Sequence, residues 1–280
     1  MAYQNKKPYG KIFRELRESK EMKQSDFEIL GVSKMTISNF EKGKSFLPIN
    51  ILDSALELMC MSLTEYEYLV NDFRFDIYED AFLRIEHAFY KGDERQLRGI
   101  AAEFESDNLR ERVISLGVKG IFRALAEEEK QKISDFLFLT EIWGIYELSL
   151  FLLILPHLES DLILSFIKDL GRKNHHLEKI FKYRRRIQQI LARAAVTFSQ
   201  RGEKKAAWTC LDYAHQIFYE RDLFTRNAYL FTRGYYRWVF EDKKKGVHDM
   251  KEALWIFEEL ECQDLTQYYQ KAYRLLIGKK

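Results

Sequence analysis

The stretch from Gln24 to Gly43 constrains the fold of this chain more than any other. Its polar and apolar pattern predicts two short helices joined by a tight turn, the arrangement of a helix-turn-helix. Gly31 supplies the turn, because glycine enters the left-handed backbone region without a Cβ clash. Ser33 is placed to cap the second helix with its hydroxyl. Ile37 and Phe40 face inward, which leaves the other side chains of that helix for a partner.

The outward side chains around this stretch favour a nucleic acid as that partner. Short donors and flexible cations bind phosphate groups. The side chains of this kind are Arg14, Arg17, Gln24, Ser33, Ser38 and Lys42. The alternative is a solvated helix face with no partner.

Charge is spread unevenly along the 280 residues. Residues 1–48 carry ten Lys and Arg against six Asp and Glu, a net of +4, whereas the remainder carries 35 against 37, a net of −2. A basic head on a near-neutral body is expected of a DNA-binding domain joined to another function. Three prolines and 15% aromatic residues favour an all-α protein, and the length suits one small and one larger domain.

Helix signals on both sides of the turn complete the small domain. Tyr9 to Lys20 reads as a first helix, Pro48 fits the first turn of a fourth, and Ser62 with Glu65 forms a capping box that starts a fifth, extending to about Phe73. We therefore expect a five-helix DNA-binding domain over residues 1–70 and a linker over 71–78. The linker contains no Gly or Pro, which favours a helical connection.

Residues 79–280 read as long amphipathic helices with an internal repeat. Ala207, Ala214 and Phe218 recur 39 residues later as Gly246, Ala253 and Phe257, and each set follows a polar turn. A period near 40 with small residues at close-packing positions predicts tetratricopeptide-like helix hairpins stacked in a right-handed superhelix. About five hairpins and a last helix over 265–277 would fill this region.

Two sets of residues resemble known families. The first resembles the Xre/Cro-type DNA-binding domain, and it comprises Leu16-Arg17, Ser33-Lys34-x-Thr36-Ile37-Ser38-x-Phe40-Glu41-Lys42-Gly43 and Ile51-Leu52. The second resembles the repeat domain of the Rgg/GadR/MutR regulators, and it comprises Trp143-Gly144-Ile145-Tyr146-Glu147-Leu148-Ser149-Leu150-Phe151, Tyr235-Tyr236, Met250, Ala253 and Ile256-Phe257. Together they cover almost the entire chain.

The resemblance implies a cytoplasmic, homodimeric transcription regulator that binds a promoter operator in double-stranded DNA. By similarity to phage repressors, Lys34, Met35 and Asn39 would read base edges, and Thr36 would contact a base or the backbone. Family members dimerise through the repeat domain, and several bind short hydrophobic pheromone peptides in its groove, as in quorum sensing. Residues 152–154, Leu-Leu-Ile, depart from a position that is commonly polar in the family.

A peptide groove would need cations and aromatic side chains on the repeat domain. The run Arg184 to Arg186 offers guanidinium groups for a carboxylate, although a solvated basic face is the alternative. Aromatic side chains crowd the later helices, where most are expected in the core. The residues predicted to contact a peptide are Tyr146, Arg184, Arg185, Arg226, Asn227, Tyr229, Arg233 and Tyr236.

Enzyme and membrane signals are weak. No phosphate-binding glycine motif, catalytic triad pattern or metal-ligand spacing occurs, so we expect no enzyme activity, cofactor or metal. The longest apolar run, Leu148 to Leu155, is too short to span a bilayer. Two other functions stay open: a helical-repeat scaffold for protein interactions, and an Xre-type regulator without a small ligand.

Overall fold

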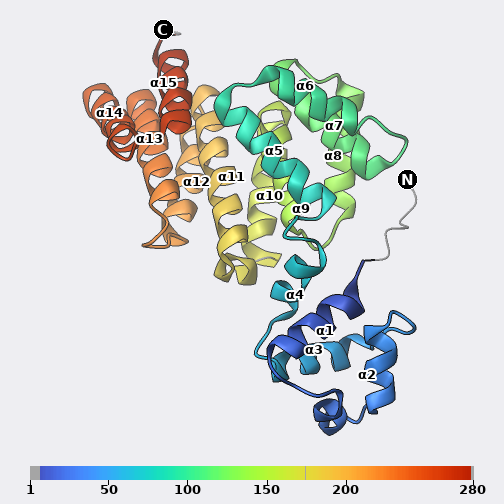
Figure 1. The fold of residues 1–280 in the computed structure, drawn as a ribbon. Helices are drawn as coiled ribbons and strands as arrows, with labels where there is room; N and C mark the ends of the chain where they lie inside the picture. The colour runs from blue at the N-terminus through green and yellow to red at the C-terminus, as the bar shows by residue number, and fades with distance from the viewer. Residues whose placement is uncertain (1–6, 174, 279–280) are drawn as a thin grey trace. The chain divides into compact units, whose positions relative to one another are not determined.

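A computed structural model describes residues 7–173 and 175–278, and over these residues the chain is all-α, as predicted, with no strand. It divides into two compact units, Met1–Asp80 and Ala81–Lys280. Figure 1 shows the short helices of the first unit and the longer, stacked helices of the second.

Five short helical elements build the first unit. They are α1 (Tyr9–Ser19), η1 (Gln24–Leu30), α2 (Lys34–Glu41), α3 (Ile49–Leu58) and α4 (Leu63–Val70). The element η1 is a 3₁₀-helix, and α4 ends three residues before the predicted position at Phe73. The expected helical connection is wrong, because residues 71–76 are not helical and Asp72 and Phe73 have φ angles of 54° and 56°. An α-helix cannot continue through left-handed residues.

Aromatic side chains fill the core of the first unit. The ring of Phe13 lies 5.4 Å from that of Phe27 and 5.3 Å from that of Phe40, and all three residues are buried with Ile37. Helix α1 also approaches α2 at backbone distance, since a Cβ on Gly10 would lie only 1.9 Å from the carbonyl oxygen of Phe40. These contacts fix α2 on its inner face and leave its other face exposed.

Eleven α-helices form the second unit in the described residues. They are α5 (Ile77–Lys91), α6 (Glu94–Glu103), α7 (Leu109–Phe122), α8 (Glu127–Leu139), α9 (Ile145–Ile154), α10 (Ser160–Lys173), α11 (Phe181–Gln200), α12 (Lys204–Gln216), α13 (Leu223–Phe240), α14 (Lys243–Glu259) and α15 (Gln263–Ile277). Two 3₁₀ turns, η2 (Leu155–His157) and η3 (His175–Lys179), lie on either side of α10. Five successive pairs and a last helix are the arrangement that the sequence predicts.

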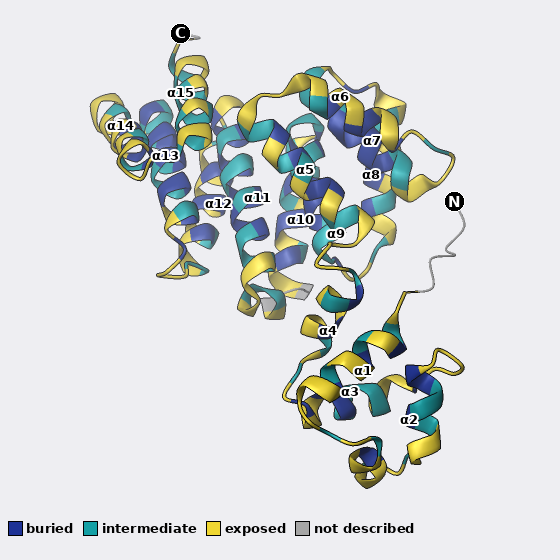
Figure 2. Cartoon of the chain, in the orientation of Figure 1, coloured by how far each residue is buried: buried dark blue, intermediate teal, exposed yellow. Residues whose placement is uncertain are grey.

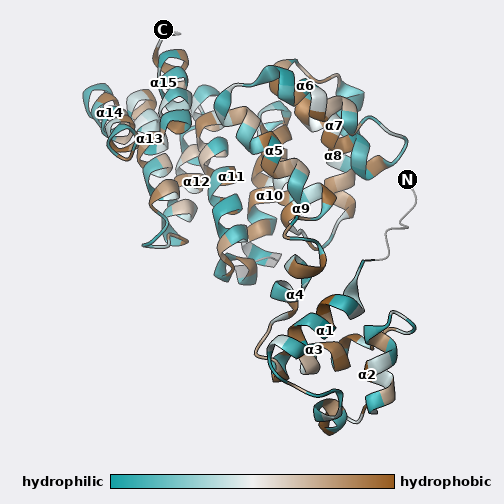
Figure 3. Cartoon of the chain, in the orientation of Figure 1, coloured by the Kyte–Doolittle hydropathy of each residue, from teal (hydrophilic) through white to brown (hydrophobic). Residues whose placement is uncertain are grey.

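Most helices of the second unit are amphipathic, so hydrophilic and hydrophobic residues alternate along them in Figure 3. Helix α11 shows why: Ile187, Leu191, Ala194 and Phe198 recur at helical spacing and are fully buried. Figure 2 shows the same contrast by burial, with dark buried faces on α7 and α13 and none on α15. The hairpins therefore share a continuous interior.

The predicted 39-residue repeat places small residues where helices touch. Ala207 on α12 and Gly246 on α14 are both buried. A Cβ on Gly246 would lie 2.5 Å from the backbone nitrogen of Trp238 and 2.6 Å from the carbonyl oxygen of Gly234. Helices α13 and α14 thus pack with their backbones in contact, which only glycine permits.

The last helix is held by aromatic contacts. The ring of Tyr269 stacks on Phe257 at 5.0 Å and meets Phe231 edge-on at 4.9 Å. Burial raises the pKa of the Tyr269 hydroxyl well above its ordinary value. Throughout residues 7–173 and 175–278, no helix combines the length and apolar character needed to cross a membrane.

Candidate DNA-binding surface and ligand cavity

The exposed face of α2 carries unpaired polar side chains. Lys34 and Lys42 are exposed, Met35 is 66% exposed, and Ser38 and Asn39 are half-buried. Within the described part of the chain, no side-chain hydrogen bond or ion pair involves Lys34, Ser38, Asn39 or Lys42. Each of these groups can therefore bind an external partner without breaking an internal contact.

The start of α2 is capped as the sequence predicts. Ser33 has an extended backbone, and its Oγ accepts a hydrogen bond of 3.1 Å from the N–H of Thr36. The two hydroxyl oxygens also lie 3.0 Å apart, within hydrogen-bond distance. Gly31 has φ 76° and forms the turn before the cap. The cap fixes where α2 begins. The hydroxyl groups of Ser33 and Thr36 are therefore already engaged in hydrogen bonds within the protein.

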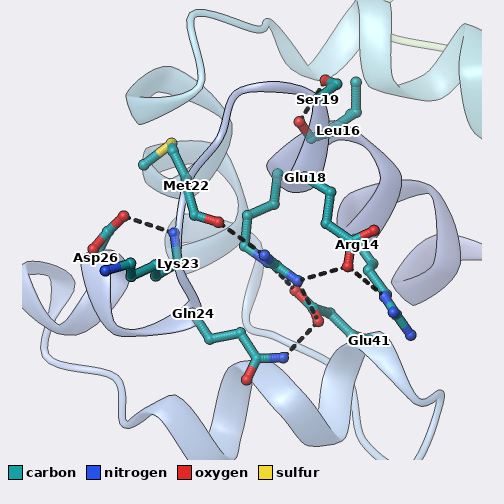
Figure 4. A network of polar contacts seen from close by, with 10 residues as sticks. Arg14, Leu16, Glu18, Ser19, Met22, Lys23, Gln24, Asp26 and Glu41 are labelled. Carbon is teal, nitrogen blue, oxygen red and sulfur yellow. Dashed lines mark hydrogen bonds and ion pairs between the residues drawn. The ribbon is translucent and has the colours of Figure 1, made fainter.

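Arg17 is buried away from a phosphate contact, whereas Gln24 is half-buried and its contact with a phosphate stays a prediction. Arg17 is only 8% exposed, and its guanidinium donates to both carboxylate oxygens of Glu41, at 2.6 and 3.1 Å, and to the carbonyl oxygen of Met22 at 2.8 Å. Gln24 donates to the same carboxylate at 2.7 Å (Figure 4). The expectation for Arg17 is corrected, because its guanidinium is buried and bonded to four internal acceptor atoms of Glu41, Met22 and Glu18.

This network stabilises the position of α2 in the first unit. It ties the last residue of α2 to α1 and to η1 across a long stretch of sequence. The hydrogen bond to Glu41 raises the pKa of the Arg17 guanidinium above its ordinary value. Arg14, by contrast, remains exposed, although its Nε donates to Glu18 at 2.8 Å. Of the two α1 arginines, only Arg14 keeps a surface suited to phosphates.

The second unit contains a cavity of about 900 Å³. Side chains of α5, α6, α7, α9, α11, α13 and α15 line most of it, so hairpins distant in sequence meet around one space. The lining is mostly apolar with a few polar groups, which is the composition of a small-ligand site. Leu152 and Leu153 belong to this wall. The Leu-Leu-Ile departure in the sequence therefore makes the cavity more apolar.

An ion pair joins α5 to α11 at the cavity wall. Arg186 donates to one carboxylate oxygen of Glu86 at 2.9 Å, and Gln189 donates to the other at 2.9 Å. The guanidinium is not fully satisfied, because Arg186 is buried and its Nε has no hydrogen-bond partner among the described residues.

Aromatic rings from the first and last helices of the unit meet at the cavity. The ring of Tyr268 on α15 lies 5.3 Å from Phe89 and 4.9 Å from Tyr90 on α5. Arg193 of α11 lies over the Phe89 ring at 5.3 Å. Burial raises the pKa of both tyrosine hydroxyls, so they are neutral donors at physiological pH.

Of the eight residues predicted to contact a peptide, Tyr229 alone lines the cavity. Arg185 pairs with Asp222 at 3.0 Å. Asn227 is buried and donates to the carbonyl oxygen of Ala253 at 2.9 Å. The expectation for Asn227 is corrected, because its side chain is buried between α13 and α14. The side chain of Arg185 is 40% exposed, and its contact with a peptide stays a prediction.

The other five predicted residues also contact the protein itself. Arg184 stacks on Tyr219 at 4.5 Å, and Arg226 lies over Phe218 at 5.6 Å. Arg233 lies 3.9 Å from the Asp249 carboxylate, and the Tyr146 hydroxyl donates a hydrogen bond to the carbonyl oxygen of Arg110. The ring of Tyr236 lies 5.7 Å from that of Trp208. None of the five lines the cavity.

Among the residues that face the cavity from α11 are Arg186, which the sequence offered only as part of the arginine run, and Gln189 and Arg193, which sequence reasoning missed. Their spacing of three and four residues is a helical stripe beside the apolar one. The stripe is visible in the sequence, but which stripe faces a ligand depends on how α11 is rotated in the fold. The prediction instead included Arg184 and Arg185, because they belong to the densest run of arginines.

Residues 94–271 match the family described as HTH-type transcriptional regulator Rgg, C-terminal domain. The match covers more than half of the chain. The chain belongs to the Rgg family. Members of this family are transcriptional regulators. In the described residues, no group of three or more His, Cys, Asp or Glu side chains is placed to hold a metal ion.

Solved structures share this Rgg fold over nearly the whole chain. A protein assigned as a transcriptional regulator in Listeria monocytogenes EGD-e has TM-score 0.81 at 16% identity, covering 97% of this chain and 98% of that one. The Streptococcus dysgalactiae SHP pheromone receptor Rgg2 has TM-score 0.78 at 20% identity, covering 96% and 100%. ComR from S. thermophilus, solved with DNA and its signalling peptide ComS, has TM-score 0.61 at 14% identity, covering 96% and 99%.

Proposed function

We propose that this chain is a cytoplasmic, homodimeric transcription regulator that binds a promoter operator through residues 1–70 and is controlled by a short apolar signalling peptide in residues 79–280. The observation that carries the DNA-binding half is the exposed face of α2, where Lys34, Ser38 and Asn39 have no internal partner among the described residues. Membership of the Rgg family and the fold shared with ComR support the same function.

The expected division of labour on α2 follows from side-chain chemistry. Asn39 can bond bidentately to adenine, Lys34 can donate to guanine, and Met35 can pack on a thymine methyl group. Lys42 and Arg14 carry flexible charges suited to phosphates. A dimer would place two copies of α2 in major grooves about 34 Å apart on a pseudo-palindromic operator.

The cavity supports control by a peptide. Its volume of about 900 Å³ and mostly apolar wall suit a short apolar chain, and polar side chains such as Gln189 can bond the peptide backbone. Such a ligand regulates DNA binding only if its affinity differs between the states that bind and release DNA, and 1.4 kcal/mol of difference shifts the balance about tenfold.

The DNA-binding half is tested with a labelled duplex of the promoter beside the gene and a scrambled duplex. Fluorescence anisotropy over a salt series should give tighter binding to the promoter. Asn39→Ala should weaken promoter binding by roughly 1–3 kcal/mol and leave scrambled DNA unaffected. Lys42→Ala should weaken both duplexes alike and flatten the salt dependence. Equal losses on both duplexes for Asn39→Ala would contradict base reading.

The scaffold alternative predicts no preference for the promoter at any salt concentration. The ligand-free regulator predicts promoter binding that does not change when apolar peptides encoded near the gene are added. Light scattering of the full chain, with and without the duplex, tests the dimer separately.

A further inference from the structure

Arg193 is a cation without an internal counter-ion. It lines the cavity from α11, and its guanidinium rests on the ring of Phe89. In the part of the chain that the structure describes, the Arg193 guanidinium has no ion pair or hydrogen bond with another residue. The guanidinium is half-buried against the Phe89 ring, and no carboxylate of the described residues compensates its charge. An anionic ligand would supply that compensation.

Two other polar atoms in the same wall are also unsatisfied. Arg186 is 9% exposed, and its Nε has no hydrogen-bond partner among the described residues. The Ser149 hydroxyl, on α9, is buried and equally without a partner there. Buried polar atoms are rarely left unpaired, and those that are deserve a functional explanation. Both atoms can donate a hydrogen bond, so a ligand rich in acceptor oxygens would satisfy them.

The charge balance of the wall points the same way. Lys91, Lys271, Arg186 and Arg193 face Glu86 and Glu94 around the cavity. Glu86 is occupied by Arg186, and Glu94 bonds Arg98 outside the cavity lining. The wall therefore has more cations than available carboxylates. A neutral apolar peptide would offer no anion to Arg193, the cation of this set that is half-buried and without a carboxylate partner in the described residues.

Arg186 and Arg193 lie two helical turns apart on one stripe of α11, a rise of about 10 Å. Gln189 lies between them. A short extended peptide can therefore place a carboxylate at one arginine while its backbone meets the amide at the next position. Arg193 is the better carboxylate site, because Arg186 is already bonded to Glu86.

We propose that Arg193 binds a carboxylate of the ligand and selects anionic peptides over neutral ones. This inference rests on the proposed peptide control. The carboxylate is an acidic side chain or the C-terminus of the peptide, and both would form the same charge-assisted hydrogen bonds with the guanidinium. Leu152 and Leu153 contribute the apolar wall that holds the rest of the peptide.

The experiment is affinity selection of synthetic octapeptides on the full-length protein, read by mass spectrometry. The pool contains apolar residues with either Asp or Asn at one variable position, and each half is made with a free or an amidated C-terminus. The wild type should enrich carboxylate-bearing peptides about tenfold or more over their neutral isosteres. Comparing the Asp-amide and Asn-acid peptides identifies which carboxylate is read.

Arg193→Gln should abolish this preference, and Arg193→Lys should retain part of it. Arg172→Gln is the matched control, because Arg172 is exposed on α10 and does not line the cavity. The ligand-free Arg193→Gln protein loses only the contact with the Phe89 ring, so it should melt close to the wild-type temperature. A large drop in the melting temperature would show that Arg193 has an internal partner and would contradict the proposal.

The remaining outcomes separate the inference from the function on which it rests. If the wild type enriches charged and neutral peptides equally, the proposal that Arg193 selects a carboxylate is wrong, but peptide control is not contradicted. A preference that persists in Arg193→Gln overturns the assignment to Arg193. Enrichment of no peptide at all rejects peptide control itself.

Discussion

Two arginine–glutamate pairs, one buried and one partly buried, distinguish the two units of this protein. Arg17 and Glu41 in the first unit have side chains that are 9% and 2% exposed, and the carboxylate also bonds Gln24. Arg186 and Glu86 in the second unit are 11% and 28% exposed, and one guanidinium nitrogen is unpaired in the described structure. The satisfied network fixes a helix in place. The unsatisfied one lies at a cavity, where a ligand can complete it.

The largest expected effect comes from breaking the satisfied pair. Arg17→Met would leave the Glu41 carboxylate buried without its cation, so we expect the first unit to lose about 3–5 kcal/mol of stability. Hydrogen exchange read by mass spectrometry should show this loss in α1, η1 and α2. The second unit should keep its stability, which tryptophan fluorescence reports, because Trp143, Trp208, Trp238 and Trp255 all lie there.

The double variant Arg17→Met/Glu41→Leu is the control, since removing both charges is often neutral or stabilising. If the double variant is no more stable than Arg17→Met, the unpaired Glu41 carboxylate is not the cause of the lost stability.

The second unit should owe more stability to helix packing than to its ion pair. Gly246→Ala puts a Cβ 2.5 Å from the backbone nitrogen of Trp238, so α13 and α14 must separate. We expect a loss of about 1–3 kcal/mol in urea unfolding followed by tryptophan fluorescence. Gly99→Ala on α6 is the control, because its Cβ meets nothing within 4 Å. It should be neutral or stabilising by up to about 1 kcal/mol.

Breaking the unsatisfied pair should cost less. Arg186→Met leaves Glu86 facing the cavity, where water can solvate it, so the expected loss is about 1 kcal/mol or less. Urea unfolding of the second unit measures this loss. A cost equal to that of Arg17→Met would remove the distinction between the two pairs.

The smallest effect concerns a third pair, on the surface. Arg123 donates to both carboxylate oxygens of Glu129 at 2.7 Å and lowers the pKa of Glu129 to about 2 from its ordinary 4.5. The folded state therefore favours the ionised form. Its contribution is fully present above pH 4.5 and is lost as the pH falls toward 2. We expect less than about 1 kcal/mol, because solvent screens the pair.

The check is urea unfolding between pH 6 and pH 3 for the wild type and Glu129→Gln. The difference in unfolding free energy between the two proteins should shrink as the pH falls. A constant difference would show that the ionised carboxylate is not responsible.

Local features of the fold were predictable because they depend on neighbouring residues. The turn at Gly31, the cap at Ser33 and the capping box of Ser62 with Glu65 follow from side chains within three or four positions. The hairpin count and the last helix followed from periodicity. The interruption after Val70 did not, because the left-handed residues there are not glycines.

The candidate sites were less predictable because they depend on distant contacts. Nothing near Arg17 in the sequence shows that its guanidinium is buried against Glu41, 24 residues away. The cavity depends on how α11 is rotated, so the sequence found the arginine run but chose Arg184 and Arg185 over Arg186. The exposed positions of α2 were easier, since the buried Ile37 and Phe40 define the opposite face.

The contact between Tyr268 and the rings of Phe89 and Tyr90 sets the number of hairpins in the array. An open solenoid can gain or lose a repeat, because each repeat touches only its neighbours. Here the first and last helices of the second unit, α5 and α15, touch one another through these rings. An inserted or deleted hairpin would part them and breach the cavity wall. The number of hairpins is therefore constrained by the same ring contacts that line the cavity.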